Sequence, residues 1–112
     1  MEPLRYEEFE RVEIRAGTIL SAEEFPQARK PAYRLEIDFG EPIGRRRSSA
    51  QLPALYSCAE LVGRQVLAVV NFPPKRIAGF SSEVLTLGVD TADGNVVLIR
   101  PDRPVPNGAR LY

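Results

Sequence analysis

The segment from Asn71 to Ser82 places apolar, aromatic and basic side chains within a short stretch of chain. Its apolar members, which a loop would display together, are Phe72, Pro73, Pro74, Ile77 and Phe80. Such a surface suits an extended polypeptide, because burial of apolar side chains supplies affinity without sequence selectivity. Prolines keep the surface preformed, which lowers the ordering cost of binding. We therefore predict that these five residues bind peptide.

A basic run, Arg45 to Arg47, suggests a different ligand. Side chains alternate between the two faces of a strand, so the first and third arginines share a face, where they are able to grip phosphates. Few aromatic residues are interleaved with them, which favours contact with a nucleic-acid backbone over reading of bases. The alternative prediction is a nucleic-acid-binding site made of Arg45, Arg47, Lys75, Arg76 and Ser82.

Both basic features also have plainer interpretations. The Arg45–Arg47 run is balanced in sequence by Glu36, Asp38 and Glu41, and would then be a solvated charge run. Arg29-Lys30 lies in a loop flanked by Pro26 and Pro31, where it either extends a cationic rim or forms an ordinary exposed turn.

The chain lacks the side chains that most enzymes use. It contains no histidine and one cysteine, Cys58, and it has no glycine-rich phosphate loop. Without histidine the common catalytic triads and most transition-metal sites are missing. Close carboxyl pairs such as Glu7-Glu8 are typical of solvated surface. We predict a protein that is not an enzyme and needs no cofactor or metal.

Bulk properties indicate a single domain spanning residues 1–112. Hydrophobic residues make up 44% and charged residues 27% of a chain whose net charge is zero, although residues 25–82 carry nine bases against four acids. The longest apolar run, Val66 to Val70, is too short to span a membrane. The N-terminus lacks the layout of a secretory signal, so we expect a cytoplasmic protein without membrane insertion.

Period-two alternation between turn residues dominates the sequence and predicts a mostly β fold. In the clearest strand Tyr33, Leu35, Ile37 and Phe39 face one way. The expected strands cover residues 12–20, 33–39, 45–52, 66–70, 84–89 and 96–99, the last two forming a hairpin across Asp93-Gly94. Gly17 interrupts the first strand, as expected where a strand bends or bulges.

One short helix is expected between the third and fourth strands. Ser57-Cys58-Ala59-Glu60 fits a capping box, and Gly63 suits the end of the helix. Five main strands with a helix at this point match the OB-fold, a five-stranded Greek-key barrel, whereas SH3-like barrels lack that helix. The fold class is therefore all-β, with an OB barrel, a C-terminal hairpin and a tail.

Two segments resemble the tRNA-binding OB domain, which occurs alone in bacteria and attached to some aminoacyl-tRNA synthetases. Residues 12–19 (VEIRAGTI) resemble its first strand, "R-V-G-x-I", and Asn71 to Arg76 resembles its "N-x-x-P-[KR]-[KR]" segment. Where that family has Ser-x-Gly-Met, this chain has Ser82-Glu83-Val84-Leu85. The loss of Gly and Met affects specific tRNA recognition more than contact with the RNA backbone.

Further segments resemble the CsaA-like group of this family, which comprises export-related bacterial chaperones. They are residues 25–33, 37–40, 48–51, 69–74 and 101–108. The resemblance implies a homodimeric chaperone that binds unfolded or precursor polypeptides and assists the Sec export machinery. A structure-specific tRNA-binding protein is the alternative, and an interaction module docking on a larger enzyme is a third possibility that rests on family analogy alone.

Apolar residues at both ends of the chain predict where a dimer would form. An isolated monomer would expose them, and a self-complementary two-fold interface would bury them. The predicted interface residues are Leu4, Tyr6, Phe9, Val105, Pro106, Leu111 and Tyr112. Separately, thirteen arginines against two lysines, together with ten prolines, fit a thermophilic source.

Overall fold

Strand β2 (Tyr33–Asp38) shows how the alternating pattern builds the core in the computed structural model, which describes residues 1–112. Tyr33, Leu35 and Ile37 are buried, and the side chains between them are half-buried on the other face. Strand β3 (Arg45–Ala50) pairs antiparallel with β2. The predicted strand and its inward face are confirmed.

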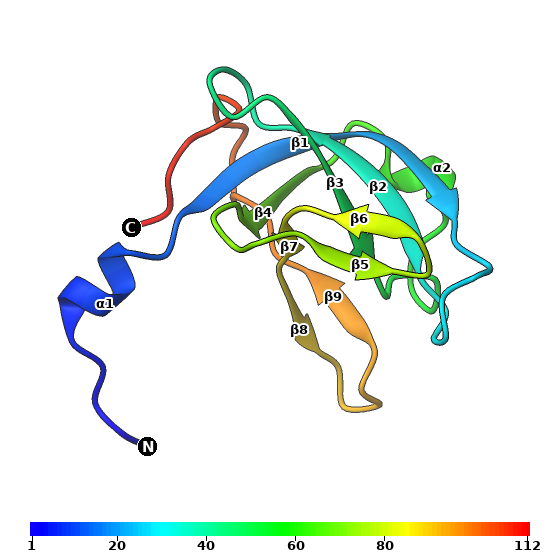
Figure 1. Ribbon diagram of the computed structural model, residues 1–112, viewed down its shortest axis with the longest axis horizontal. Helices are drawn as coiled ribbons and strands as arrows, with labels where there is room; N and C mark the ends of the chain where they lie inside the picture. The colour runs from blue at the N-terminus through cyan, green and yellow to red at the C-terminus, as the bar shows by residue number, and fades with distance from the viewer.

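Strand β1 (Ile14–Glu24) is the longest element and joins the two halves of the sheet (Figure 1). Its first part pairs with β4 (Gln65–Val69) and its second part with β2, so that Thr18 has a partner on both sides. Strand β7 (Leu85–Thr86) pairs with β4. The resulting antiparallel order is β3-β2-β1-β4-β7.

Hydrogen bonds between the two edges of this sheet turn it into a nearly closed barrel. Ser48 Oγ on β3 donates to Val84 O at 3.2 Å, and Thr86 Oγ1 on β7 donates to Ser48 Oγ at 2.8 Å. Glu83 N donates to Arg47 O at 2.8 Å. The five-stranded OB-type barrel predicted from sequence is therefore confirmed. Its largest fully buried apolar side chains are Phe39, Ile19, Leu35, Ile37, Leu52, Leu61 and Val66.

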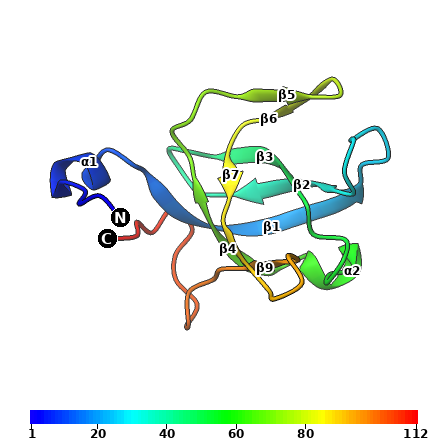
Figure 2. The ribbon, with the colours of Figure 1, turned by 90° about the horizontal axis from the view of Figure 1, so that it is seen from below.

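Two short helices flank the barrel. In α2 (Cys58–Leu61) Glu60 N donates to Ser57 Oγ at 3.3 Å and Ser57 N donates to Glu60 Oε1 at 2.9 Å, which is the predicted capping box between β3 and β4. Leu61 is fully buried in the core. Helix α1 (Tyr6–Glu10) buries none of its residues and projects from the barrel beside the C-terminus (Figures 1 and 2). Neither helix has the length and apolar composition that crossing a membrane requires.

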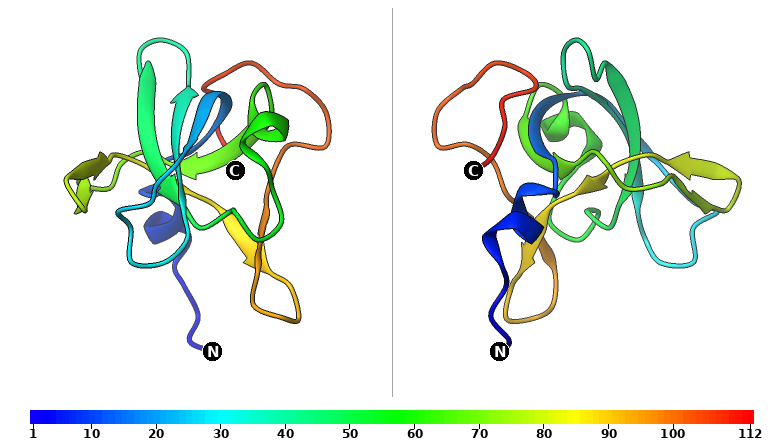
Figure 3. Two further views of the ribbon diagram at one scale, coloured as in Figure 1. Left: turned by 90° about the vertical axis from the view of Figure 1, so that its right-hand side faces the viewer. Right: turned by 60° about the vertical axis from the view of Figure 1, so that its left-hand side comes forward.

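Two hairpins extend away from the barrel in different directions (Figure 3). Strands β5 (Lys75–Ile77) and β6 (Phe80–Ser82) form one of them. Strands β8 (Gly88–Asp90) and β9 (Val96–Leu98) form the other, across the predicted turn. The C-terminal tail then returns along β1, where Ala16 N donates to Ala109 O at 2.9 Å and Leu111 N donates to Ile14 O at 2.9 Å.

The irregularity of β1 lies a few residues beyond the predicted position. The register with β2 shifts between Ile19 and Ser21, whereas Gly17 pairs regularly with Val66. A Cβ atom at Gly17 would lie 2.6 Å from Ile37 Cγ2 and 2.8 Å from the Phe39 ring. Gly17 is therefore required by close packing across the barrel and not by the bulge.

We expect Gly17→Ala to lower the free energy of unfolding by roughly 1–3 kcal/mol, because the added methyl overpacks the core. Urea unfolding followed by far-UV circular dichroism measures this change. Ser21→Ala, on the same strand but adding no atoms, is the control and should stay close to wild type. An unchanged unfolding midpoint for Gly17→Ala would contradict the packing argument.

Candidate binding groove

The hairpin β5–β6 leaves the barrel because of the residues at its base and tip. Pro73 and Pro74 lack the N–H groups that a sheet needs, so the chain cannot continue β4 as a ladder. At the tip, Ala78 and Gly79 have φ values of 47° and 82°, the positive angles that fit a two-residue hairpin turn. The hairpin is therefore a separate ribbon standing beside β3.

Phe80 attaches this ribbon to the barrel. Its ring packs edge-on against the buried Phe25 with the centroids 5.5 Å apart, and the guanidinium of Arg47 lies over it at 5.2 Å. Arg34 covers the other ring, Phe25, at 5.4 Å. Aromatic pairs of this geometry stabilise by about 0.5–1.5 kcal/mol beyond their buried area. Phe80 thus anchors the hairpin to the barrel. Although it was predicted to bind peptide, it does not line the groove described below.

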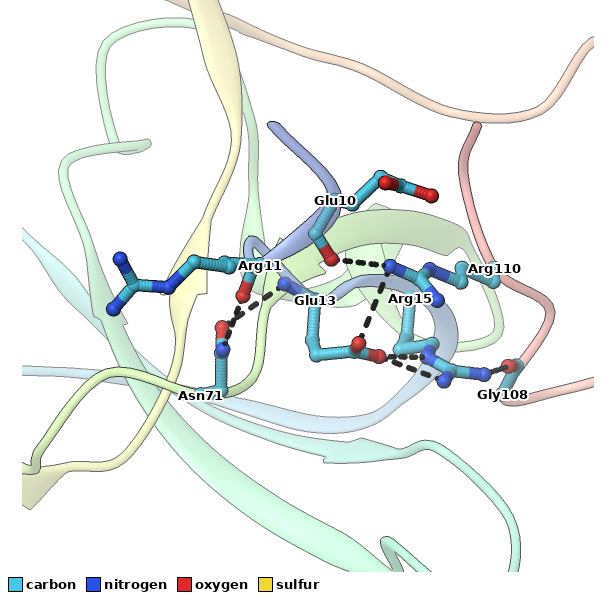
Figure 4. A network of polar contacts seen from close by, with 7 residues as sticks. All are labelled: Glu10, Arg11, Glu13, Arg15, Asn71, Gly108 and Arg110. Carbon is cyan, nitrogen blue, oxygen red and sulfur yellow. Dashed lines mark hydrogen bonds and ion pairs between the residues drawn. The ribbon is translucent and has the colours of Figure 1, made fainter. Parts of the chain in front are cut away.

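Asn71 fixes the start of the same segment to the N-terminal region (Figure 4). Its Nδ2 donates to Arg11 O at 2.8 Å, and Glu13 N donates to its Oδ1 at 3.0 Å. Glu13 in turn accepts from Arg15 at 2.7 Å and forms an ion pair of 3.3 Å with Arg110 in the tail. The loop base, the approach to β1 and the C-terminal tail are therefore one connected unit.

The space between the ribbon and β3 is a groove of about 510 Å³. Its apolar lining consists of Phe72, Pro73, Ile77, Val84 and Leu85, and its polar lining consists of Ser49, Gln51, Lys75, Ser82 and Glu83. Phe72 and Leu85 are 53% and 50% exposed, so both side chains are available to a ligand. Three of the predicted peptide-binding residues therefore lie together here, whereas Pro74 is exposed outside the lining.

A second hollow of about 830 Å³ continues this groove, because Ser49, Gln51, Lys75 and Ile77 line both. Its other walls come from the loop between β1 and β2 and from the hairpin tip, and they carry Arg29, Lys30 and Arg76. We call the two hollows together the β3 groove. One end of it is apolar and the other end is cationic.

The structure divides the residues predicted for nucleic-acid binding. Lys75 and Arg76 line the β3 groove, and Ser82 lines it while accepting a hydrogen bond from Ser49 N at 3.0 Å. Arg45 instead pairs with Glu36 at 3.8 Å, and Arg47 pairs with Glu83 at 3.8 Å. The pair of Arg45 with Glu36 is one that the plainer interpretation of the run named, whereas Glu83, the partner of Arg47, was not among its acids.

Sequence reasoning missed the groove residues contributed by β3 and by the segment after β6. Val84, Leu85 and Gln51 come from chain positions that only the barrel closure brings beside the hairpin. One signal was present, since Val84 and Leu85 are the two positions at which the sequence departs from the Gly-Met of the family pattern.

Apolar side chains are also exposed near both ends of the chain. Leu4, Tyr6 and Tyr112 are 66%, 65% and 100% exposed, and Phe9 lies against Tyr6 with ring centroids 6.4 Å apart. A hollow of about 270 Å³ between the tail and β1 is lined mostly by apolar residues. Of the predicted interface residues it contains Val105, Leu111 and Tyr112, while Pro106 is exposed outside it.

The chain is similar to a family of tRNA-binding domains and to solved chaperone structures. Residues 14–110 match the family model described as a putative tRNA binding domain. The chain is 36% identical over 110 residues to methionine–tRNA ligase of Porphyromonas gingivalis and 38% identical over 106 residues to that of Methanothrix thermoacetophila. The two matches include 98% and 95% of this chain, but this chain spans only 16% and 15% of the length of the two ligases.

Two solved structures match over their full length. The chaperone CsaA from Bacillus anthracis is 50% identical, with a TM-score of 0.93 and coverage of 99% of this chain and 100% of that one. The CsaA chaperone protein from Picrophilus torridus is 46% identical, with a TM-score of 0.90 and coverage of 98% and 100%. The resemblance noted from sequence is therefore confirmed.

The polar network around Glu13 predicts that stability depends on pH. A hydrogen bond from Arg15 is the main cause that holds the pKa of Glu13 below its ordinary value; desolvation opposes it, and the charges of Arg110 and Arg15 lower the pKa further. A depressed carboxyl pKa stabilises the folded state above the unfolded pKa, and this contribution is lost as the pH falls through the folded pKa. We expect wild type to lose more stability than Glu13→Gln between neutral and strongly acidic pH.

Urea unfolding of both proteins at neutral and at acidic pH measures the difference. Glu2→Gln, which removes an exposed carboxylate without an ion pair, should keep the pH dependence of wild type. Identical pH profiles for wild type and Glu13→Gln would contradict the assignment.

Proposed function

Because the chain belongs to the tRNA-binding domain family, whose model matches residues 14–110, we propose that it is a binding protein that holds unfolded or precursor polypeptides as a chaperone. The observation that carries this proposal is the β3 groove, in which Phe72, Ile77 and Leu85 line one preformed apolar end. The proposal assigns no catalytic step and no cofactor to the chain. Its action is passive shielding of hydrophobic segments.

The walls of the groove favour a polypeptide ligand. Burial of apolar surface contributes about 25 cal/mol per Å² without demanding one sequence. Pro73 and the anchored hairpin hold the walls in place, so less entropy is lost when a ligand binds. A groove of this kind accepts many clients, which is what a chaperone requires.

Similarity to two chaperones named CsaA supports the same function. The role in export belongs to the proposal as well: we propose that the chain delivers precursors to the Sec machinery from the cytoplasm. The sequence resemblance to export-related chaperones is its support.

A second candidate function is tRNA binding, which the family model and the charges of Lys75 and Arg76 favour. Neither side chain has an ion-pair partner, so the positive charge of each is available to phosphates, although one Arg76 N–H donates to Gly79 O at 3.1 Å. In this case the cationic end of the groove would contact the RNA backbone, and affinity would fall steeply with salt.

We also propose that two copies associate through their termini. Helix α1 buries none of its residues, and it lies on the same side of the molecule as the C-terminus (Figure 1). Tyr6, where the helix begins, and Tyr112, the last residue, are both exposed. A two-fold axis at this patch would bury the apolar side chains of both copies. Dimerisation would also double the grooves and so raise the avidity for a long client.

Polypeptide binding is tested by fluorescence anisotropy of a labelled, unfolded precursor near physiological salt, challenged with unlabelled tRNA. We expect binding that survives the challenge. Phe72→Ala combined with Leu85→Ala should weaken it at least about tenfold, because two apolar contacts worth roughly 1 kcal/mol each are lost.

Val89→Ala combined with Leu55→Ala is the matched control, since both side chains are exposed and apolar and lie outside the groove. Absence of polypeptide binding by wild type would overturn the proposal and leave tRNA as the leading ligand. Lys75→Ala combined with Arg76→Ala should abolish tRNA binding if RNA occupies the groove.

Sedimentation velocity tests the association. We expect wild type at twice the 12.5 kDa of one chain. Leu4→Asp combined with Tyr6→Asp should give monomers, because the interface would then bury charges. Val62→Asp, at an exposed apolar residue outside the patch, should leave the dimer intact. A monomeric wild type would show that the termini are not an interface.

A further inference from the structure

Four basic residues gather at one end of the β3 groove without any carboxylate to balance them. Arg29 and Lys30 come from the loop between β1 and β2, and Lys75 and Arg76 come from β5. No aspartate or glutamate lines this hollow. None of the four takes part in an ion pair, whereas Arg45 and Arg47, on the neighbouring strand, both do.

The one acidic residue that lines the β3 groove is already engaged. Glu83 lines the apolar end of the groove, but its carboxylate accepts a hydrogen bond from Arg47 N at 2.9 Å and pairs with the Arg47 guanidinium at 3.8 Å. The cationic end therefore keeps its positive potential, although the chain as a whole has zero net charge. Such a potential attracts anions and repels cations.

The apolar and cationic ends are parts of a single path. Lys75 and Ile77 line both hollows, and so do Ser49 and Gln51 on the rim of β3. An extended chain that places apolar side chains between Phe72 and Leu85 and follows this path passes Lys75 and enters the basic end. Neighbouring residues of such a ligand would therefore contact the apolar lining and the basic side chains.

We propose that the β3 groove selects polypeptide segments in which an apolar stretch adjoins acidic residues, and that it disfavours segments in which the same stretch adjoins lysine or arginine. This inference rests on the proposed function and names the class of client for that site. The four basic residues, none of which has an ion-pair partner, would select ligands by charge beside a sequence-tolerant apolar pocket. Specificity then comes as much from repulsion of basic segments as from attraction of acidic ones.

The apolar end favours a polypeptide over RNA as the occupant of this path. Single-stranded RNA is held by aromatic platforms on which bases stack. The lining of the β3 groove offers one aromatic side chain, Phe72, and the rest of its apolar lining is aliphatic side chains and proline. RNA is therefore an outcome to be tested and not the ligand that the walls fit.

The experiment uses three fluorescein-labelled peptides that share one apolar core and differ only in a flank of four glutamates, four glutamines or four lysines. Anisotropy titration with the full-length chain gives the three affinities. We expect the glutamate peptide to bind roughly tenfold more tightly than the glutamine peptide, and the lysine peptide to bind more weakly than both, since each exposed charge pair adds a modest amount.

The dependence of affinity on salt separates the contribution of charge from that of apolar burial. Raising ionic strength from about 0.01 M to about 1 M shortens the range of charge interactions from about 30 Å to about 3 Å. The preference for the acidic flank should disappear over this range. Binding of the glutamine peptide should hold, because salt does not weaken apolar burial.

Variants locate the effect. Lys75→Gln combined with Arg76→Gln, and separately Arg29→Gln combined with Lys30→Gln, should each reduce the difference in affinity between the glutamate peptide and the lysine peptide. Arg100→Gln combined with Arg103→Gln removes the same charge from a hollow that shares no residue with the β3 groove. That control should behave as wild type.

The outcomes distinguish the inference from the function on which it rests. If the glutamine peptide binds but the glutamate peptide binds no more tightly than the lysine peptide, the selection by charge is overturned and the chaperone function stands. If no peptide binds, the proposed function is overturned and the inference falls with it. If tRNA displaces every peptide and loses affinity in the Lys75/Arg76 variant, the basic end belongs to RNA and the inference is overturned.

Discussion

The double pairing of β1 is the constraint on which the rest of the molecule depends. Its first part holds β4 and the returning tail, and its second part holds β2, so one strand carries both halves of the barrel. The strand passes so close to Ile37 and Phe39 that Gly17 has no room for a side chain. With β1 in place, β2 and β4 are fixed, and the edges β3 and β7 are brought together.

The β3 groove is a consequence of the way in which the barrel closes. The chain between β4 and β7 must cross the open side of the barrel, and Pro73 and Pro74 prevent it from joining the sheet as it does so. It therefore stands out as the hairpin β5–β6, attached through Phe80 and through Ser82 to the edge of β3. The rest of that edge stays open and forms one wall of the β3 groove.

The features that local physics dictates could be predicted from the sequence. Alternation at Tyr33, Leu35 and Ile37 identified β2 and its inward face, and the Ser57–Glu60 capping box located α2. Features that depend on register could not be predicted. Three such features are the ion pair of Arg47 with Glu83, the packing of Phe80 on Phe25, and the shared lining of one hollow by Phe72 and Leu85. Each of them depends on the tertiary fold, which brings separate segments of the chain together.

The same dependence on closure explains how one fold suits two classes of ligand. The barrel supplies a fixed edge and a projecting ribbon, while a few side chains decide what lies between them. Basic residues at one end suit any anionic chain, whether phosphate or carboxylate carries the charge. Aliphatic groups at Val84 and Leu85, together with Phe72, add a surface that gains from burial and offers little for bases to stack on. The side chains at the apolar end therefore favour a polypeptide over a nucleic acid as the ligand, and this preference requires no change in the barrel itself.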